Sequence, residues 1–510
     1  MNSQSSNLKR LDDVEEFERE LLRYLELFAG AFDELHGAVT KQAKAPGQNI
    51  GPHPNYPIMS RLAGGFPSFD EAGFYRDESP RDYVGMVLRN GADCIIRAFG
   101  HGHPDPDLPK RAELASFLRN HEIGNRLRSP LVYEDTLSDW RVDELVADAV
   151  ERYLHLYGLD TPVEAERRDA VIRPLVFGTV SPSLHLSLVV PIALTHFEVD
   201  HFPLTETTYI TRMPKKLQLG RARMSTVGSG AVKMVVGAAT HAFVSNGWTL
   251  DVDNVDEVRS SLRQPSSNAL DAIDSFLGAL RMVAGISTGY AQILWVPRRW
   301  TLDYFCDLTP VYSTTLRRYP NEFDNFGWMN HGATIKTERL NELRRIYRVV
   351  VSSQSEAIRL ALSRLNSCLT RTDGADAVLD GTIGLELLLG DDQNQSLSYK
   401  LRLRAAALAI LRADPAYPPA EVASKVKRLY EARSAIVHGK RKKPSKKASG
   451  STDTRYSEER LLASELLRFI LNVLLTNPKY QDPTRIDEGL LLRGDEIARA
   501  CLHTSNDNAQ

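Results

Sequence analysis

The chain has 510 residues, which is more than one hydrophobic core usually supports, so we expect two or three domains. A hydrophobic fraction of 42% and a charged fraction of 25% are ordinary for a soluble globular protein. A formal net charge of -2 excludes a general attraction for nucleic acid, so any such attraction must be local.

The cysteines and the apolar segments indicate a cytoplasmic protein with no membrane partner. The four cysteines have no paired spacing, which predicts neither a zinc knuckle nor a disulfide framework. The first ten residues lack the apolar core of a signal peptide. No apolar run approaches the roughly 20 residues needed to cross a bilayer, and the longest candidate, residues 184–194, is interrupted by polar residues and a proline.

Residues 1–165 are expected to form a mixed, largely helical N-terminal region. Apolar residues at a spacing of three or four predict one helix over residues 8–36, and residues 45–80 are rich in proline and glycine, as irregular connections are. Further helices are expected at residues 82–99, 108–121 and 142–157.

Residues 166–335 are expected to form a β-rich sensor or regulatory domain. Short stretches rich in valine, isoleucine, threonine and phenylalanine, separated by proline, glycine and asparagine, predict strands. The expected strands are residues 171–180, 184–193, 195–201, 207–213, 232–243, 290–296 and 301–306. One helix, over residues 268–284, is expected to pack on this sheet.

Residues 336–510 are expected to form an all-α bundle, which makes the fold class α+β and multidomain. Amphipathic stripes predict helices at residues 338–370, 375–389, 396–413, 421–438 and 457–476. The lysine- and serine-rich residues 440–455 are polar enough for a mobile loop.

The fourth expected helix of the bundle carries an unusual set of polar residues. Arg433 falls on the apolar stripe, where a guanidinium is costly unless it has a partner or a use. His438 follows in the last turn, and Gly439 is the expected C-terminal stop. A dense basic run comes directly afterwards. These features together suggest a site for a phosphate-bearing ligand.

This helix resembles the signature of the HEPN superfamily of small helical ribonucleases and nucleotide-binding modules. Residues 429–439, Leu-Tyr-Glu-Ala-Arg-Ser-Ala-Ile-Val-His-Gly, match its pattern of an arginine, four to six residues and a histidine. Residues 382–389 and the Arg- and Ala-rich residues 399–411 support a likeness to the Apea-like branch of bacterial anti-phage, abortive-infection proteins. The resemblance covers about residues 340–480.

The resemblance implies an endoribonuclease toxin of antiviral defence. Its implied substrate is cellular RNA, with tRNA the leading candidate, and Arg433 and His438 are its implied catalytic residues. It also implies a homodimer in which the two signature helices face each other. The N-terminal two thirds would then sense a phage-derived trigger or restrain the nuclease.

The spacing of Arg433 and His438 also favours a site shared by two copies. Residues five apart on an ideal helix are separated by about 140° around its axis, so they do not share a face. Two antiparallel copies related by a two-fold axis bring the arginine of one to the histidine of the other. We therefore expect a homodimer or a higher homo-oligomer.

RNA cleavage at such a site needs neither a metal nor a cofactor. A histidine, with an ordinary pKa of about 6.5, takes or gives the proton at a ribose oxygen near neutral pH. An arginine offers a fixed fork that matches two phosphate oxygens. The expected products carry a 2′,3′-cyclic phosphate and a 5′-hydroxyl. Supporting roles are expected for Glu386, Ser434 and Tyr430, and RNA binding for Lys440, Arg441, Lys442 and Lys443.

Several patterns allow other interpretations. Arg433 paired with Glu386 and a capping His438 would leave a non-catalytic module for dimerisation and for binding a ligand or nucleic acid. His196, Glu198 and Asp200 fall on one face of an expected strand, which suggests a divalent metal, although a solvated strand end is favoured. Two further patterns, the pair His101 and His103 and the segment 295–300 with two tryptophans and two arginines, are interpreted as a loop and as an edge strand with cation-π packing.

Overall fold

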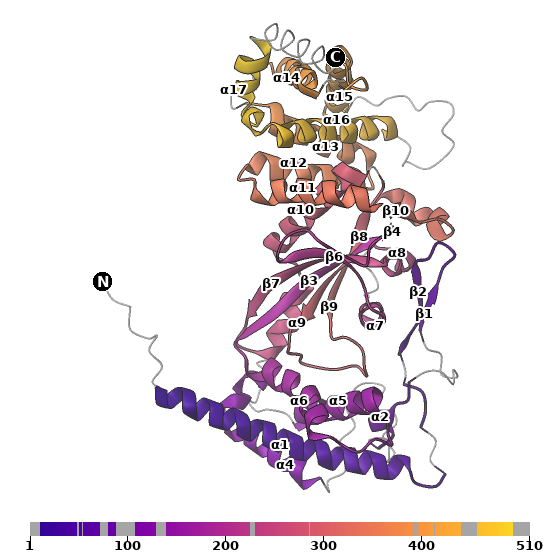
Figure 1. The fold of residues 1–510 in the computed structure, drawn as a ribbon, viewed down its shortest axis with the longest axis vertical. Coiled ribbons are helices and arrows are strands. Elements are labelled where there is room, and N and C mark those ends of the chain that lie inside the picture. The colour runs from indigo at the N-terminus through magenta and orange to yellow at the C-terminus, as the bar shows by residue number, and fades with distance from the viewer. Residues whose placement is uncertain are drawn as a thin grey trace, which may run out of the picture.

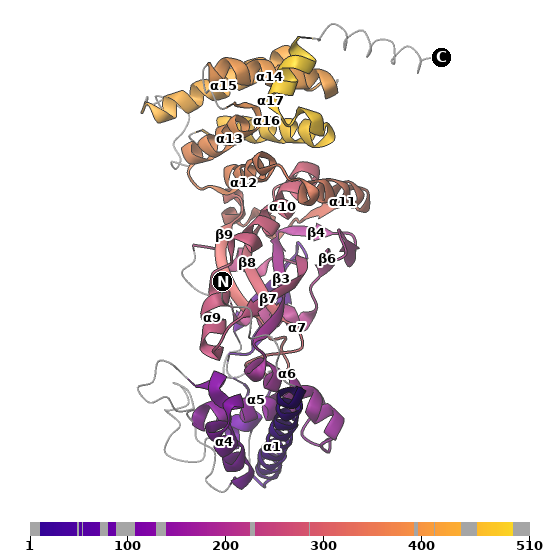
Figure 2. The ribbon, with the colours of Figure 1, turned by 90° about the vertical axis from the view of Figure 1, so that its left-hand side faces the viewer.

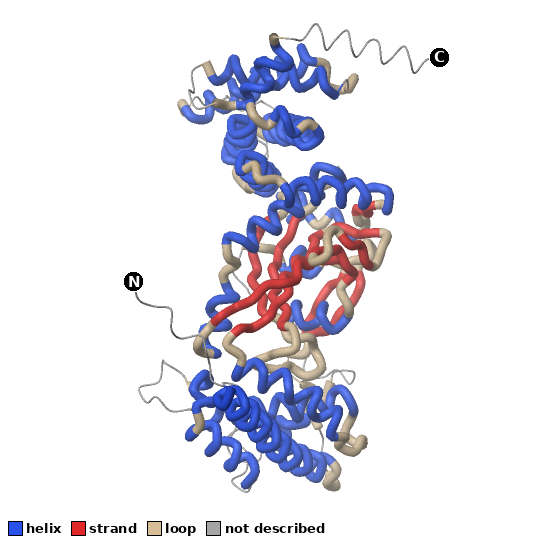
Figure 3. The backbone as a smooth tube through the Cα atoms, turned by 60° about the vertical axis from the view of Figure 1, so that its left-hand side comes forward, coloured by secondary structure: helices blue, strands red, loops and turns tan. Residues whose placement is uncertain are grey.

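The chain is a mixed α+β protein built as a stack of layers. The computed structural model describes residues 11–47, 50–53, 55–71, 80–87, 108–128, 139–224, 230–284, 286–391, 396–412, 414–439 and 456–492. Helices of the N-terminal part lie at one end of the long axis, a sheet with a few short helices beside it lies in the middle, and the C-terminal helices lie at the other end (Figures 1 and 3).

The first layer is a group of helices around the long helix α1 (Leu11–Ala43), which extends past the predicted end at residue 36. Its other members are α2 (Tyr83–Val87), α4 (Pro109–Asn120), η1 (Glu122–Leu127), α5 (Asp139–Tyr157) and α6 (Ala165–Val180). Aromatic residues of α1, among them Tyr24, Phe28 and Phe32, are fully buried against α5 and α6. A short antiparallel hairpin of β1 (Pro57–Arg61) and β2 (Pro67–Glu71) follows α1 in the chain.

Helix α6 corrects the predicted strand at residues 171–180. The buried Val171, Ile172, Leu175 and Val176 recur at helical spacing and complete the core of the first layer. Their β-branched composition favours a strand, but contact with the neighbouring helices decides the conformation here. The helical core therefore continues to residue 180.

The middle layer is a six-stranded antiparallel sheet with the strand order β5-β6-β7-β3-β8-β9. Its strands are β3 (Ser183–Ala193), β5 (His201–Pro203), β6 (Thr208–Arg212), β7 (His241–Asp251), β8 (Gly289–Pro297) and β9 (Tyr312–Arg318). A separate parallel pair joins β4 (Thr195–Phe197) to β10 (Ala333–Ile335). The central strand β3 pairs with β7 on one side and with β8 on the other.

Both faces of the sheet are covered. Alternate residues of β3, such as Leu186 and Leu188, belong to the core formed with α10 (Ser267–Ala284). Val189, the next residue after Leu188, packs with Leu217 of α7 (Lys215–Arg223) on the opposite face. A strand covered on both sides is apolar along most of its length, which is why β3 is clear in the sequence.

Two other predictions for the middle region are wrong, and one helix was not predicted. Residues 301–306 are a loop, and the edge strand next to β8 is β9, whose partly exposed residues give a weak apolar pattern. Residues 232–243 contain the short helix α8 (Lys233–Gly237) before β7 begins. Helix α9 (Val255–Arg263), capped by the side chain of Asn254, was not expected.

The expected helix at residues 338–370 is two helices, α11 (Thr337–Ser352) and α12 (Glu356–Thr370). The side chain of Ser355 accepts a hydrogen bond from the backbone N–H of Ile358 and so begins α12. Both helices pack on α10, which lies on the sheet.

The last layers are α13 (Gly374–Leu389), α14 (Leu397–Arg412), α15 (Pro419–Val437) and α16 (Ser457–Thr476), followed by α17 (Pro483–Ile486) and a π-helical turn η6 (Asp487–Leu491) (Figure 2). Helices α13 and α16 approach closely at Gly381, which has no side chain. A Cβ atom added there would lie 2.7 Å from the Cβ atom of Ala463. One hydrophobic cluster runs from Leu186 in the sheet to Val426 and Leu466 in these helices. The hydrophobic core is therefore continuous across residue 336, where the all-α bundle was expected to begin.

Among the described residues, no helix combines the length and the apolar character that crossing a membrane requires.

Candidate functional site

The candidate site lies at the C-terminal end of α15. Prolines 418 and 419 begin this helix, where a missing N–H costs nothing, and Val422, Val426 and Leu429 bury its apolar stripe. The stripe leaves the core near the end of the helix, where the side chain of Val437 is 55% exposed. Gly439, with a φ of 65° and open space around it, ends the helix in the left-handed conformation.

The structure places Arg433 beside Glu386 of α13. Arg433 Nε lies 3.5 Å from Glu386 Oε1, and the arginine and glutamate side chains are 32% and 20% exposed. The guanidinium carbon also lies 5.4 Å from the centre of the Tyr430 ring. Tyr430 packs against the core, so it fixes one side of the arginine.

The contact between Arg433 and Glu386 is an ion pair without a hydrogen bond. Within the described residues, no hydrogen bond reaches the enclosed Oε1 atom of Glu386, and Arg433 donates none. Burial raises the pKa of the Glu386 carboxyl group, and the positive charge of Arg433 opposes that rise. The N–H groups of Arg433 are therefore held in place by packing and charge while remaining uncommitted as donors.

His438 is exposed at the last turn of α15. Its backbone N–H donates to the carbonyl oxygen of Ser434, which ties the histidine to the helix end. Neither imidazole nitrogen has a hydrogen-bond partner in the part of the chain that the structure describes, and there is no contact there between His438 and Arg433. One copy of the chain therefore presents the two side chains separately.

Two exposed apolar side chains lie at the same end of the α14–α15 hairpin as His438. Tyr399 is 60% exposed in the first turn of α14, and Val437 ends α15. The two helices pack side by side and run in opposite directions, so the start of α14 lies beside the end of α15 (Figure 2). Lys440, Arg441, Lys442 and Lys443 lie outside the described residues.

No family model, curated protein or solved structure matches the chain.

The alternative metal site at His196 is not formed. His196 Nε2 lies 2.8 Å from the carbonyl oxygen of Gly64, and its ring stacks on Phe66 at 4.0 Å. Glu198 and Asp200 follow the end of β4, and each has a different partner: Glu198 accepts from Thr337, and Asp200 from Arg212. In the described chain the ligand atoms of this set do not come together.

The tryptophans of residues 295–300 are core residues. Trp295 and Trp300 are each 5% exposed, and the Trp300 indole N–H donates to the carbonyl oxygen of His185. Strand β8 lies between β3 and β9, so the expectation of an edge strand is wrong. No cation-π contact joins Arg298 or Arg299 to these rings within the described residues. His101 and His103 lie outside the described residues.

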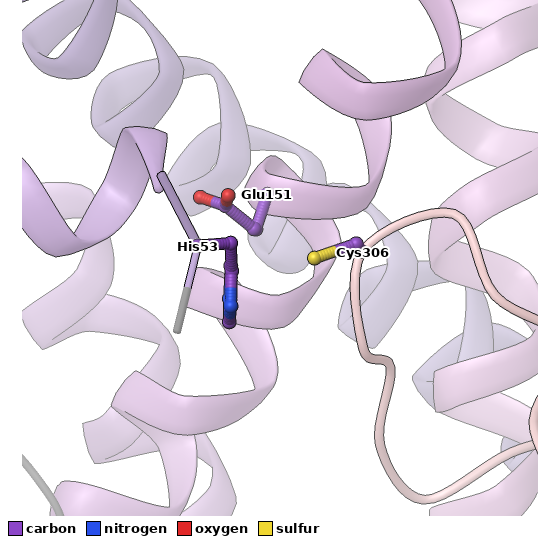
Figure 4. Close-up of side chains that lie close together, drawn as sticks. All are labelled: His53, Glu151 and Cys306. Atoms are coloured by element: carbon purple, nitrogen blue, oxygen red, sulfur yellow. The ribbon is translucent and has the colours of Figure 1, made fainter. Parts of the chain in front are cut away.

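His53, Glu151 and Cys306 come from three distant segments and form a group that no local sequence pattern predicts (Figure 4). Their potential ligand atoms lie within 4.8 Å of one another, and imidazole, carboxylate and thiolate are all zinc ligands. The Glu151 carboxylate, however, already accepts from the backbone N–H groups of Tyr83 and Val84. Burial raises the pKa of the Cys306 thiol, which keeps it neutral. The hydrogen bonds of Glu151 instead join α5 to the start of α2.

Proposed function

We propose that the chain is a metal-independent endoribonuclease with a HEPN-like C-terminal bundle. Its cleavage site is formed by Arg433 of one copy and His438 of a second copy. The observation that supports this most is the state of the two side chains: Arg433 is one-third exposed with unused N–H donors, and His438 is exposed. A polynucleotide is able to reach both.

The chemistry follows from the two groups. The imidazole of His438 takes the proton of the ribose 2′-hydroxyl, whose oxygen attacks the adjacent phosphorus, and the imidazolium so formed then protonates the leaving 5′-oxygen. The bond between phosphorus and the 5′-oxygen breaks, leaving a 2′,3′-cyclic phosphate and a 5′-hydroxyl. Arg433 stabilises the charge on the phosphate oxygens, and Glu386 and Tyr430 hold the guanidinium in position.

The two-copy arrangement has support from the surface around His438. Tyr399 and Val437 are both exposed apolar side chains at that end of the hairpin, and a second copy would cover them. Cellular RNA, with tRNA first, is the proposed substrate, and growth arrest during phage infection is the proposed outcome.

A second candidate function rests on the ion pair itself. If Arg433 serves only to neutralise Glu386, the bundle is a non-catalytic module for dimerisation and for binding a ligand or nucleic acid.

Incubation of the purified protein with total tRNA, followed by sequencing of the RNA ends, tests the proposal. The wild type and the exposed control His331→Ala are expected to produce ends with 2′,3′-cyclic phosphate, in the presence of EDTA as well as in its absence. His438→Ala is expected to lower the rate by a factor of about 100 to 10,000. Unchanged cleavage by His438→Ala would rule out the proposed site.

A further inference from the structure

A cavity of about 440 Å³ lies between the sheet and the C-terminal helices. One wall comes from the end of α10 and the connections next to β8 and β9. The other comes from the end of α12, the start of α13 and the part of α16 from Ser457 to Arg468. The volume falls in the range of cavities that bind small molecules, which is about 300 to 1,000 Å³.

Three guanidinium groups line this cavity: those of Arg281, Arg460 and Arg468. The only carboxylate in the lining is that of Glu322, which accepts a hydrogen bond from Ser287. Within the described residues, no salt bridge includes any of the three arginines. The walls therefore carry an excess of positive charge.

Arg281 is buried in the cavity wall and is held there by hydrogen bonds. It is 2% exposed, its Nε and Nη2 atoms donate to the carbonyl oxygen of Thr288, and its Nη1 atom donates to Asn366. Burial lowers its pKa to about 10, so the side chain is still charged near neutral pH. Its hydrogen bonds are all to neutral groups, and the one carboxyl group that acts strongly on its charge, that of Asp274, lies outside the cavity lining. The three guanidinium groups therefore outnumber the nearby carboxyl groups, which favours an anion in the cavity.

The two arginines of α16 have unused donors. Arg460 donates through Nη2 to the carbonyl oxygen of Leu369, and Arg468 donates through Nε to that of Ser464. A guanidinium has five N–H groups, so each has several left for a ligand. Apolar side chains, among them Ile286 and Leu461, line the same space.

We propose that this cavity binds a nucleoside phosphate, with the phosphate on the three arginines and the ring system against the apolar wall. The fork of a guanidinium group can donate two parallel hydrogen bonds to two oxygens of one phosphate, so arginine suits a phosphate ligand. The ligand would bridge the sheet to α16, which packs on α13 and α15, the helices of Glu386 and Arg433. Through these helices the ligand would influence cleavage. This influence on cleavage rests on the proposed function, whereas ligand binding does not.

Titration calorimetry of the full chain with ADP and GDP, using adenosine as the phosphate-free probe, tests the site. ADP or GDP is expected to bind and adenosine is not. Arg460→Gln and Arg468→Gln are each expected to weaken binding by about tenfold or more, because each removes a charged hydrogen bond. The exposed Arg339→Gln on α11 serves as the matched control and is expected to bind normally.

If neither ADP nor GDP binds at about 1 mM, or if binding is unchanged in both α16 variants, the proposal is overturned. Circular dichroism of the two variants shows whether they are folded, which is expected because both arginines are partly exposed. His438→Ala is expected to bind nucleotide like the wild type, so failure of the nuclease proposal and failure of this one are distinguishable.

Discussion

Arg433 of α15 lies against Glu386 of α13, with 3.5 Å between the Nε and Oε1 atoms and no hydrogen bond to that oxygen within the described residues. The carboxyl group is enclosed, and its pKa is raised by burial in spite of the neighbouring cation. The pair is therefore weak as a structural tie, and its arginine is available to a ligand.

The pH dependence of stability tests this view of Glu386. Because the folded chain holds the carboxyl proton more tightly than the unfolded chain does, the glutamate lowers stability progressively as the pH rises from its ordinary pKa of 4.5 through its raised value. Below that window the penalty is absent. Glu386→Gln is therefore expected to gain stability relative to the wild type between about pH 4 and about pH 7, measured by urea unfolding. If the wild type instead gained stability relative to Glu386→Gln over this pH range, the pKa of Glu386 would not be raised in the folded chain.

The basic run after Gly439 is predicted to bind the RNA backbone. Replacing Lys440, Arg441, Lys442 and Lys443 with glutamine is expected to weaken RNA binding by the His438→Ala protein and to flatten its dependence on salt. Each lost phosphate contact reduces the slope of log K against log salt by about 0.7 for a single strand. Fluorescence anisotropy between about 50 and 200 mM salt measures this slope. An unchanged slope would show that these residues do not contact phosphate.

The close approach of α13 and α16 predicts a sharp cost at Gly381. A methyl group there would meet the Cβ atom of Ala463 at 2.7 Å, and that atom is unable to move without its backbone. Gly381→Ala is expected to lower the free energy of unfolding by about 1 to 3 kcal/mol. Gly37→Ala, in the interior of α1 with open space around it, is the matched control and is expected to gain about 0.5 to 1 kcal/mol. A loss at Gly37 as large as that at Gly381 would refute the steric explanation.

Arg404 is predicted to hold the end of the bundle together. This buried arginine of α14 donates to Asp391, to Asp487 and to the carbonyl oxygen of Leu389. Arg404→Gln is expected to cost about 2 to 3 kcal/mol in urea unfolding, because charged hydrogen bonds are lost. Arg428→Gln, which breaks an exposed pair on α15, is expected to change stability by less than about 1 kcal/mol. Equal effects of the two changes would contradict the role of Arg404.

The sequence predicts elements well where a single periodicity dominates. Helices α13 to α16 and strands β3 and β8 fall within a few residues of their predicted bounds, because each has one clear apolar pattern. The break between α11 and α12 was missed because the apolar stripe continues across it. The capping serine, Ser355, is the local signal that marks the break.

The remaining misses depend on contacts that are distant in sequence. Helix α6 has the composition of a strand, but packing on α1 and α5 decides its conformation. The proximity of Arg433 and Glu386 was foreseen because both sit on amphipathic helices of one bundle. In contrast, Arg281 and Arg468 are on separate elements, and only the fold brings them to one cavity. No local pattern reveals such a set.

A complementation experiment tests most directly whether Arg433 and His438 act from two copies. Arg433→Ala and His438→Ala proteins, each inactive alone, are co-expressed so that their subunits mix at random. A mixed dimer has one complete site, with the arginine from the His438→Ala chain and the histidine from the Arg433→Ala chain. RNA cleavage is then expected to recover to about a quarter of the wild-type rate. No recovery, in a sample shown to contain mixed dimers, would contradict a site shared between copies.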